Sequence, residues 1–468
     1  MKRIILTFTV FCILAACSSN QNKNRFLGFW QGPHPEDPSK NFYFHLYQTQ
    51  NQVQAHGYWT ENNFYNSQFN IDSVSVNGDS ISFFIPDWGC TYKGEFCGNL
   101  NISGGFSCLG EPFDSVRLTR NDEVSKYLTE AKPGCSSESY RYSHSIPSNQ
   151  NDKLIPSNFQ SPNDSLFVYS LIPEIIRSDY GRLNSFLLVK DGKLICEEYF
   201  FGYTSSDLHQ IESSTKSVTS LAYGIAHDKK IIDDVQTPIY MIFPEYKHLA
   251  QGEYQSITVK HLLTMTAGFD IENDAVFRSD NRIDFALRRN LAHAPGTKFV
   301  YDGGSTEILG AIVKKGTGMF IDDFVKKNLF TPLAIDSYNW EIYRQDGYPS
   351  TGGSLWLTPR AMAKIGLLVL NNGVFDGQQI VSQDWITEST SVQTKTHIEG
   401  DNYGYQWWRI TLNSSENSYS TVWANGWGSQ FIYIVPELKV VIVTTGYNYE
   451  NDSWAITNGI SKYIYLLK

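Results

Sequence analysis

Strand patterns lie at both ends of residues 164–468, and a mostly helical region separates them. Near the start, two runs rich in apolar strand formers, 185–189 and 194–196, flank the sequence Lys-Asp-Gly-Lys, which is typical of a hairpin turn. Three further strand patterns follow towards the C-terminus, at 404–409, 429–435 and 440–445. Strands from both ends of a region with helices between them predict one sheet assembled from the two chain ends, an α+β domain.

The preceding residues, 25–120, carry a different pattern that predicts a separate small domain. Apolar and more polar residues alternate with period two over 42–47, as in a half-buried strand. The sequence Asn-Gly-Asp at 77–79 separates two further strand patterns and indicates a tight hairpin. Because short strands and turns dominate, we expect an antiparallel barrel or sandwich.

Residues 121–163 are rich in Ser, Asn, Pro and charged residues, a composition typical of a linker. Tyr140, Tyr142 and Ile146 supply apolar groups, so we expect this linker to wrap the second domain. A length of 468 residues, of which 41% are hydrophobic and only 18% charged, fits two or three globular units. The net charge of −10 argues against nucleic acid as a partner, since phosphate backbones require a basic face.

The N-terminus has the pattern of an export signal. Met1-Lys2-Arg3 precedes an apolar run that is too short to span a bilayer comfortably, and small residues then lead to Cys17. The sequence Leu-Ala-Ala-Cys resembles the lipobox of bacterial lipoproteins, which implies cleavage after residue 16, lipidation of Cys17 and a tether over 17–24. We therefore expect an exported protein, lipid-anchored on the periplasmic or cell-surface side of a bacterial membrane. An ordinary signal peptide with an incidental cysteine is the alternative.

Cysteine number and spacing bear on disulfides and metals. Besides Cys12 and Cys17 the chain has five cysteines, so in an oxidising compartment at least one stays a thiol. One disulfide is expected within the trio Cys90, Cys97 and Cys108, with the pair left open; Cys135 and Cys196 are the remaining two. The cysteines have no zinc-ribbon spacing and the histidines form no H-E-x-x-H motif, so we expect no metal and no cofactor.

Ser213 and Lys216 are the first candidates for chemistry. Apolar residues between 218 and 226 recur with a helical period, which predicts a helix with both residues in its first turn. Residues three apart on a helix are neighbours, so the Lys216 ammonium can reach the Ser213 hydroxyl, while the helix N-terminus favours negative charge there. The pattern predicts an activated nucleophile, although a bare S-x-x-K also arises when a capping serine precedes a solvated lysine.

Several other segments occur in the order expected for one family. With the motif Ser-Ser-Thr-Lys after a hairpin, the region from about residue 179 onwards resembles the serine β-lactamase and penicillin-binding family. The likeness is greatest to its class C-like branch of esterases, D,D-peptidases and 6-aminohexanoate-dimer hydrolase. The supporting segments are 259–268 (VKHLLTMTAG), 295–299 (PGTKF), 352–359 (GGSLWLTP) and 403–408 (YGYQWW). The resemblance implies a β-lactamase-like domain in which Ser213 forms an acyl-enzyme.

The family's second motif, Y-x-N, is present only in part. Tyr301 matches, and the resemblance implies that Tyr301 and Lys216 act as a coupled pair in proton transfer. Gly303 stands where the family has asparagine, which puts strict β-lactam or peptidoglycan specificity in doubt. Asp302 is interpreted as a turn residue rather than a catalytic carboxylate.

The third motif, K-T-G or H-x-G on an edge strand, also departs from the family pattern. Ala424 occupies the cationic position that normally holds a substrate carboxylate, which favours a neutral ester or amide. By family position, Asn425 and Gly426 would bind substrate, and the backbone N–H groups of Ser213 and Trp427 would form the oxyanion hole.

The leading hypothesis is thus a serine hydrolase that acts on a small ester or amide. A β-lactamase or D,D-carboxypeptidase is the alternative within the family. A binding lipoprotein whose hydrolase domain has lost its activity is the alternative of another class. An α/β-hydrolase is disfavoured because the chain has no G-x-S-x-G motif.

Overall fold

The computed structural model describes residues 25–33, 41–49, 52–61, 64–86, 89–98, 100–108, 111–122, 142–232, 234–271, 273–342, 346–449 and 453–468. The chain divides into two compact units, Met1–Gly134 and Cys135–Lys468. The leader, the tether with Cys17, and the expected linker residues Cys135 and Tyr140 lie outside the described residues. Within the described part, none of the helices combines the length and apolar character needed to cross a bilayer.

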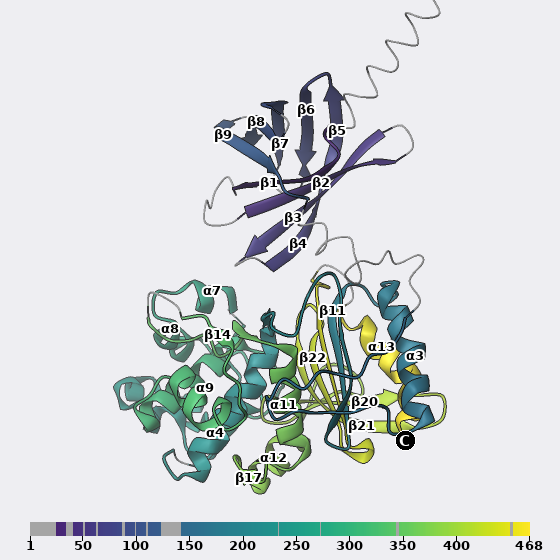
Figure 1. The fold of residues 1–468 in the computed structure, drawn as a ribbon. Coiled ribbons are helices and arrows are strands. Elements are labelled where there is room, and N and C mark those ends of the chain that lie inside the picture. The colour runs from purple at the N-terminus through teal and green to yellow at the C-terminus, as the bar shows by residue number, and fades with distance from the viewer. Residues whose placement is uncertain are drawn as a thin grey trace, which may run out of the picture. The chain divides into compact units, whose positions relative to one another are not determined.

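The first unit is a curled antiparallel sheet, drawn in purple to blue in Figure 1. Its described strands are β1 (Gly28–Pro33), β2 (Asn41–Thr49), β3 (Gln52–Glu61), β4 (Phe64–Asn70), β5 (Asp72–Asn77), β6 (Ser80–Ile85), β7 (Cys90–Phe96), β8 (Asn101–Cys108) and β9 (Glu111–Arg120). They follow the order β4-β3-β2-β1-β9-β8-β7-β6-β5. Because β5 also lies against β3, the sheet forms a nearly closed barrel, which confirms the expected class of fold.

The barrel interior is apolar and largely aromatic. Phe42, Phe44 and Leu46 point inwards at 0–1% exposure, as the alternation of residues 42–47 predicts. Trp30 is fully buried and its indole N–H donates to the Phe26 carbonyl at 2.7 Å. These residues belong to one contiguous core cluster, so burial of apolar surface is the main source of stability for this unit.

A disulfide joins neighbouring strands of the barrel. Cys90 of β7 lies directly opposite Cys108 of β8, and the two are bonded. This settles which pair of the expected trio forms the bridge. Cys97 is an exposed free thiol, and Cys196 of the second unit is a buried thiol.

The sheet of the second unit is assembled from both chain ends, as predicted (Figure 1). Its order is β10-β12-β11-β23-β22-β21-β20-β19-β18. The early strands are β10 (Ile155–Pro156), β11 (Leu183–Lys190) and β12 (Lys193–Tyr199). The late ones are β18 (Thr394–Lys395), β19 (Asn402–Tyr403), β20 (Trp408–Asn413), β21 (Ser418–Gly426), β22 (Gln430–Val435) and β23 (Val440–Gly446).

Helices cover the two faces of this sheet. On β11, Phe186 packs its ring against Phe167 of α3 (Pro162–Ile176), whereas Leu187 and Val189 on the opposite face join the core cluster that contains α11 (Pro359–Leu370). Helix α13 (Ala455–Tyr463) lies beside α3 in Figure 1. The helical region beside the sheet contains α4 (Thr215–Asp228), α5 (Ile239–Ile242), α6 (Val259–Leu263), α7 (Asn273–Arg278), α8 (Arg282–Arg288), α9 (Gly303–Thr317), α10 (Ile321–Val325) and α12 (Gln383–Thr390).

Two local expectations need correction. The strand predicted over 404–409 begins only at Trp408, because Gln406 adopts a left-handed φ of +63° and its N–H donates to the Leu263 carbonyl at 3.0 Å. In the segment that precedes α3, Tyr142 docks by a 2.7 Å hydrogen bond to Glu198, whereas Ile146 is 57% exposed. Docking of the described residues 142–163 therefore depends partly on polar contacts.

Candidate active site

Ser213 lies in a 3₁₀ turn, Glu212–Ser214, that runs directly into α4. The helix proper begins at Thr215, so Ser213 precedes the first turn in which the sequence placed it. Glu212 has a φ of +49°, a conformation that a non-glycine residue adopts at a cost and that clusters at functional sites. The Lys216 ammonium lies 2.9 Å from the Ser213 hydroxyl oxygen, so the structure brings together the two residues of the predicted nucleophile.

Neighbouring side chains fasten this turn to the sheet. The Ser214 hydroxyl donates to the Gln430 carbonyl at 2.8 Å, and the Ser217 hydroxyl donates to the Gln406 carbonyl at 2.8 Å. Gln406 in turn donates through its amide to the Leu262 and Leu263 carbonyls and accepts from Thr306 of α9. Gln406 thus links α4, α6 and α9. The YGYQWW motif includes this residue, but the sequence did not reveal its linking role.

Lys216 is held on two further sides. It is 4% exposed, and its ammonium donates to the Gly352 carbonyl at 2.5 Å. The same ammonium lies 4.9 Å from the centre of the Tyr301 ring. Since a buried ammonium needs hydrogen-bond acceptors, the Gly352 carbonyl and the Ser213 hydroxyl fix both its position and its direction. Ser213, Lys216 and Tyr301 therefore form one cluster.

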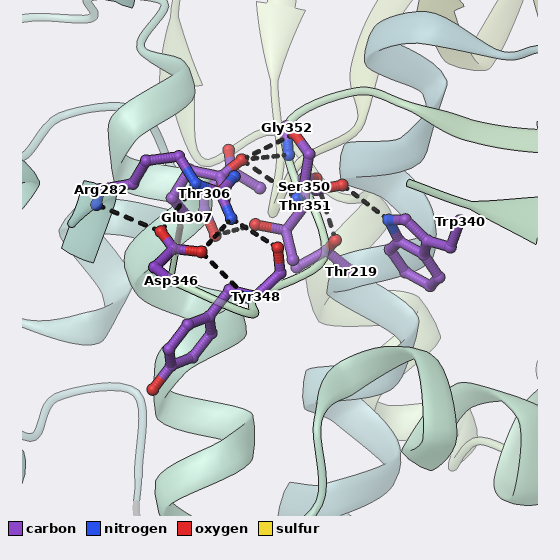
Figure 2. A network of polar contacts seen from close by, with 10 residues as sticks. All are labelled: Thr219, Arg282, Thr306, Glu307, Trp340, Asp346, Tyr348, Ser350, Thr351 and Gly352. Atoms are coloured by element: carbon purple, nitrogen blue, oxygen red, sulfur yellow. Dashed lines mark hydrogen bonds and ion pairs between the residues drawn. The ribbon is translucent and has the colours of Figure 1, made fainter. Parts of the chain in front are cut away.

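Glu307 holds the loop that provides the Gly352 carbonyl (Figure 2). One carboxylate oxygen of Glu307 accepts from the N–H groups of Thr351 and Gly352, each at 3.0 Å, and from the Ser350 hydroxyl at 3.1 Å. Its other oxygen accepts from Arg282 at 2.9 Å. Arg282 also pairs with Asp346 and is 0% exposed.

The environment of Glu307 is electrostatically unusual. Burial raises the pKa of its carboxyl group above the ordinary value, and Arg282, the Gly352 N–H, the Ser350 hydroxyl and Lys216 act in the opposite direction. The Glu307 carboxylate accepts hydrogen bonds from three groups of the Gly352 loop and from Arg282. Glu307 is therefore a positioning residue for the Gly352 loop and, through that loop, for Lys216. In the sequence Glu307 is an ordinary residue within a helix, so no motif marked it.

An aromatic cluster surrounds Tyr301. Its ring centre lies 5.5 Å from that of Trp408 and 6.3 Å from that of Tyr403, and Phe299 packs against all three. Burial, reinforced by the nearby Tyr301, raises the pKa of Tyr403 well above its usual value, so Tyr403 stays a neutral phenol. These buried side chains form an apolar cluster beside Tyr301. The sequence motifs that contain them were recognised, but the motifs did not reveal this packing.

Asp302 has a structural role. It is the N-cap of α9, where its carboxylate accepts from the N–H groups of Gly304 and Ser305, each at 3.0 Å. Its two oxygens also form a bidentate pair with Arg289, at 2.7 and 2.9 Å. The carboxylate is therefore fully used in fixing the turn that presents Tyr301. Gly303 is the first residue of α9 and is buried, so it places no side chain in the position of the family's asparagine.

The end of β21 passes close to the nucleophile turn. A Cβ atom at Gly426 would lie 2.2 Å from the Ile211 carbonyl, so only glycine fits there. Strand β21 lies between β20 and β22 rather than at an edge, which corrects the expectation for this motif. Its ladder with β20 ends at Trp423, however, so residues 424–426 run beyond that partner strand.

Asn425 and Trp427 flank Gly426 as the motif predicts. Asn425 pairs with Phe431 of β22 and is partly exposed. Trp427 follows the strand in the turn before β22; its side chain is 58% exposed and packs edge-on against Tyr449, with ring centres 5.1 Å apart. The close approach of Gly426 to Ile211 places the end of β21 beside the turn that carries Ser213. The assignment of the backbone N–H groups of Ser213 and Trp427 as the oxyanion hole stays a prediction.

Comparison with known proteins gives the family. Residues 184–452 match the model of the Beta-lactamase family, and the chain belongs to that family. The 6-aminohexanoate-dimer hydrolase of Paenarthrobacter ureafaciens is 25% identical over 288 residues, which is 56% of this chain and 71% of the relative. Protein flp of Staphylococcus aureus strain N315 is 30% identical over 168 residues, or 32% of this chain and 33% of that protein.

Among solved structures, a family VIII carboxylesterase superimposes with a TM-score of 0.52 at 16% identity, over 66% of this chain and 99% of the other. At that identity the likeness establishes the fold alone. Fold, family and site geometry together define a β-lactamase-family hydrolase domain that follows a small β-barrel.

Proposed function

We propose that the chain is a serine hydrolase that forms an acyl-enzyme on Ser213 with a neutral ester or amide substrate. The observation that carries the proposal is the 2.9 Å contact between the Lys216 ammonium and the Ser213 hydroxyl, with the same ammonium held by the Gly352 carbonyl. The related amide hydrolase and the structurally similar carboxylesterase support an acyl-transfer reaction of this kind.

The reaction follows from the positions of these groups. The pair of Lys216 and Tyr301 starts the reaction one proton short, as a neutral amine beside a phenol or an ammonium beside a phenolate. The Ser213 oxygen attacks the substrate carbonyl, and the hydroxyl proton passes to this pair. When the bond to the leaving group breaks, that proton moves to the departing alcohol or amine. A water molecule then attacks the acyl-enzyme with the same proton acceptor, which releases the acid and restores the Ser213 hydroxyl.

Two features support a neutral substrate. Ala424 occupies the position at which a cationic side chain would hold a substrate carboxylate. Its neighbours on β21, Trp423 and Asn425, are uncharged as well. The aromatic cluster of Phe299, Tyr403 and Trp408 beside Tyr301 suits an apolar acyl or leaving group. Both features disfavour penicillins and peptides that end in a carboxylate.

A substrate panel tests this proposal. We expect turnover of short-chain p-nitrophenyl esters and of small neutral amides, and little turnover of a chromogenic cephalosporin. Ser213→Ala would abolish the ester and amide activity. Rapid cephalosporin turnover that depends on Ser213 would support Ser213 as the nucleophile but contradict a neutral ester or amide as the substrate. Activity that persists in Ser213→Ala would contradict the proposal.

We also propose that the exported protein is anchored through Cys17. The basic start, the apolar run and the Leu-Ala-Ala-Cys sequence support this step. Metabolic labelling with a fatty acid in a bacterial host would place label on the wild type and on Cys97→Ser but not on Cys17→Ala. Label that remains in Cys17→Ala would contradict the assignment.

A further inference from the structure

Three side chains of metal-ligand type converge in the second unit, away from the Ser213 site. One nitrogen of His144, the sulfur of Cys196 and one carboxylate oxygen of Glu198 all lie within 4.8 Å of one another. Cys196 and Glu198 are 0% and 2% exposed, and His144 is partly buried. This cluster combines three chemically different donors and is not a surface group of acids.

The local structure explains why these side chains meet. Cys196 and Glu198 are two residues apart on β12, so their side chains project from the same face of the sheet. His144 belongs to the extended segment that crosses this face. Its ring stacks on Phe159 with centres 4.1 Å apart, and its backbone N–H donates to the Tyr169 hydroxyl of α3. The imidazole is therefore held over β12 by contacts independent of any ligand.

We propose that His144, Cys196 and Glu198 bind a divalent transition-metal ion, zinc in particular. Thiolate, imidazole and carboxylate are all established zinc ligands, and three protein ligands with a fourth position for water are a common arrangement. One thiolate, one carboxylate and a neutral imidazole balance the two positive charges of the ion. The charge of the ion compensates the negative charges of its thiolate and carboxylate ligands.

The distances fit such a site after a small contraction. Metal–ligand bonds of about 2.0–2.3 Å in a tetrahedron require ligand atoms about 3.3–3.8 Å apart, so the three donors draw together by about 1 Å. A small shift of the segment that carries His144 and lies outside the sheet supplies that movement. The ion then fastens the first described segment of the second unit to β12.

Tyr142 completes the surroundings as a second-layer donor. Its hydroxyl donates to Glu198 at 2.7 Å and lies 3.4 Å from the Nδ1 atom of His144. A donor that orients a ligating carboxylate typically changes metal affinity by about 10- to 100-fold.

The sequence did not reveal this cluster, and the proposal replaces our expectation that no metal binds. The C-x-E pair of Cys196 and Glu198 is too short to be a recognised motif, and His144 lies in a segment of linker composition. Only folding of that segment across β12 brings the third donor to the other two.

Metal analysis of the full-length protein tests the proposal. After incubation with zinc and gel filtration, elemental mass spectrometry should find about one zinc per chain in the wild type and in Cys97→Ser, a matched change at the exposed barrel thiol. Cys196→Ser and His144→Gln should lose this zinc, and Tyr142→Phe should bind it about 10- to 100-fold more weakly. Cobalt in place of zinc should give a thiolate charge-transfer band that Cys196→Ser lacks.

Folding of each variant is checked by near-ultraviolet circular dichroism and by ester hydrolysis. If Cys196→Ser does not fold, His144→Gln provides the same test from the outer segment. Zinc should also raise the Tm of the wild type and of Cys97→Ser, but not that of His144→Gln. Wild-type protein without stoichiometric zinc or cobalt, or equal retention in His144→Gln and wild type, would overturn the proposal.

Discussion

The barrel and the catalytic region differ in what they bury. Among the barrel side chains that the structure describes, the buried ones are apolar or aromatic, with Trp30 and Phe44 at 0% exposure. The region around Ser213 instead buries Lys216, Arg282 and Glu307, each at 4% exposure or less. An apolar core lowers the free energy of the folded state, whereas buried charges cost desolvation and must be compensated by partners.

The buried charges mark the region of the molecule in which function is expected. The charges of the catalytic region form a connected chain from Arg282 through Glu307 and the Gly352 loop to Lys216 and Ser213. Each member fixes the next in space. We therefore expect substitutions in the barrel to change stability, and substitutions in the charge network to change the rate of reaction.

The largest expected effect is at Lys216. Lys216→Met keeps the length of the side chain but removes one member of the proton-accepting pair, so kcat for ester hydrolysis should fall by about 10⁴-fold. Stopped-time assays with a p-nitrophenyl ester measure this loss. Lys364→Met, which removes another buried lysine of the same domain, serves as the control. A fall in kcat smaller than tenfold in Lys216→Met would contradict the expectation that the charge network controls the reaction rate.

Next in size is the barrel core. Trp30→Ala should lower the free energy of unfolding of the barrel by roughly 3–5 kcal/mol, because it leaves a large cavity. Hydrogen exchange of barrel peptides measures this change, and Trp30→Phe should give a smaller one. The described contacts of Ser213, Lys216 and Tyr301 lie within the second unit, so ester hydrolysis should keep its rate. If Trp30→Ala also lowered the rate of ester hydrolysis, the expectation that barrel substitutions change only stability would be wrong.

A smaller effect is expected at Glu307. Glu307→Gln keeps the shape but removes the charge that faces Arg282, so the Gly352 loop shifts and kcat should fall about 10- to 100-fold with little change in KM. Asp164→Asn is the matched control, because Asp164 of α3 and Lys190 of β11 form a buried ion pair outside this network. An equal fall of kcat in both variants would indicate general destabilisation in place of positioning.

The smallest effect concerns acid stability. Burial lowers the pKa of His209 to about 3, below the ordinary value of 6.5. The unfolded chain therefore binds an extra proton between these values, and the free energy of unfolding should fall by about 2 kcal/mol from pH 6.5 to pH 5. Hydrogen exchange in β11 and β23 measures the slope, which His209→Gln should make markedly shallower; the part that remains comes from other groups such as His261, whose pKa burial also lowers. An unchanged slope in that variant would contradict the assignment.

Patterns of local sequence predicted much of the fold. Period-two alternation located β2, and the hairpin signals at Gly78 and Gly192 mark turns where φ is +62° and +75°. Local patterns failed at Gln406, where contacts with α6 hold a left-handed turn in a sequence rich in strand formers. The ladder position of β21 was likewise set by its neighbours in the sheet, and its own sequence does not encode it.

The candidate site could be predicted where side-chain chemistry carries the signal. Ser213, Lys216 and Tyr301 have distinctive functional groups at recognised spacings, and the structure places them together. The Gly352 carbonyl could not be found in this way, because every residue has a backbone carbonyl. Glu307 and the His144 cluster depend on tertiary contacts between distant segments, which no local spacing reports.

Intact-mass spectrometry after treatment with a fluorophosphonate is the most direct test of acyl-enzyme formation on Ser213. We expect one covalent adduct on the wild type and on Ser206→Ala, which changes an exposed serine of the same unit, and none on Ser213→Ala. An adduct that persists in Ser213→Ala, or wild-type protein that stays unlabelled, would contradict the assignment of Ser213 as the nucleophile.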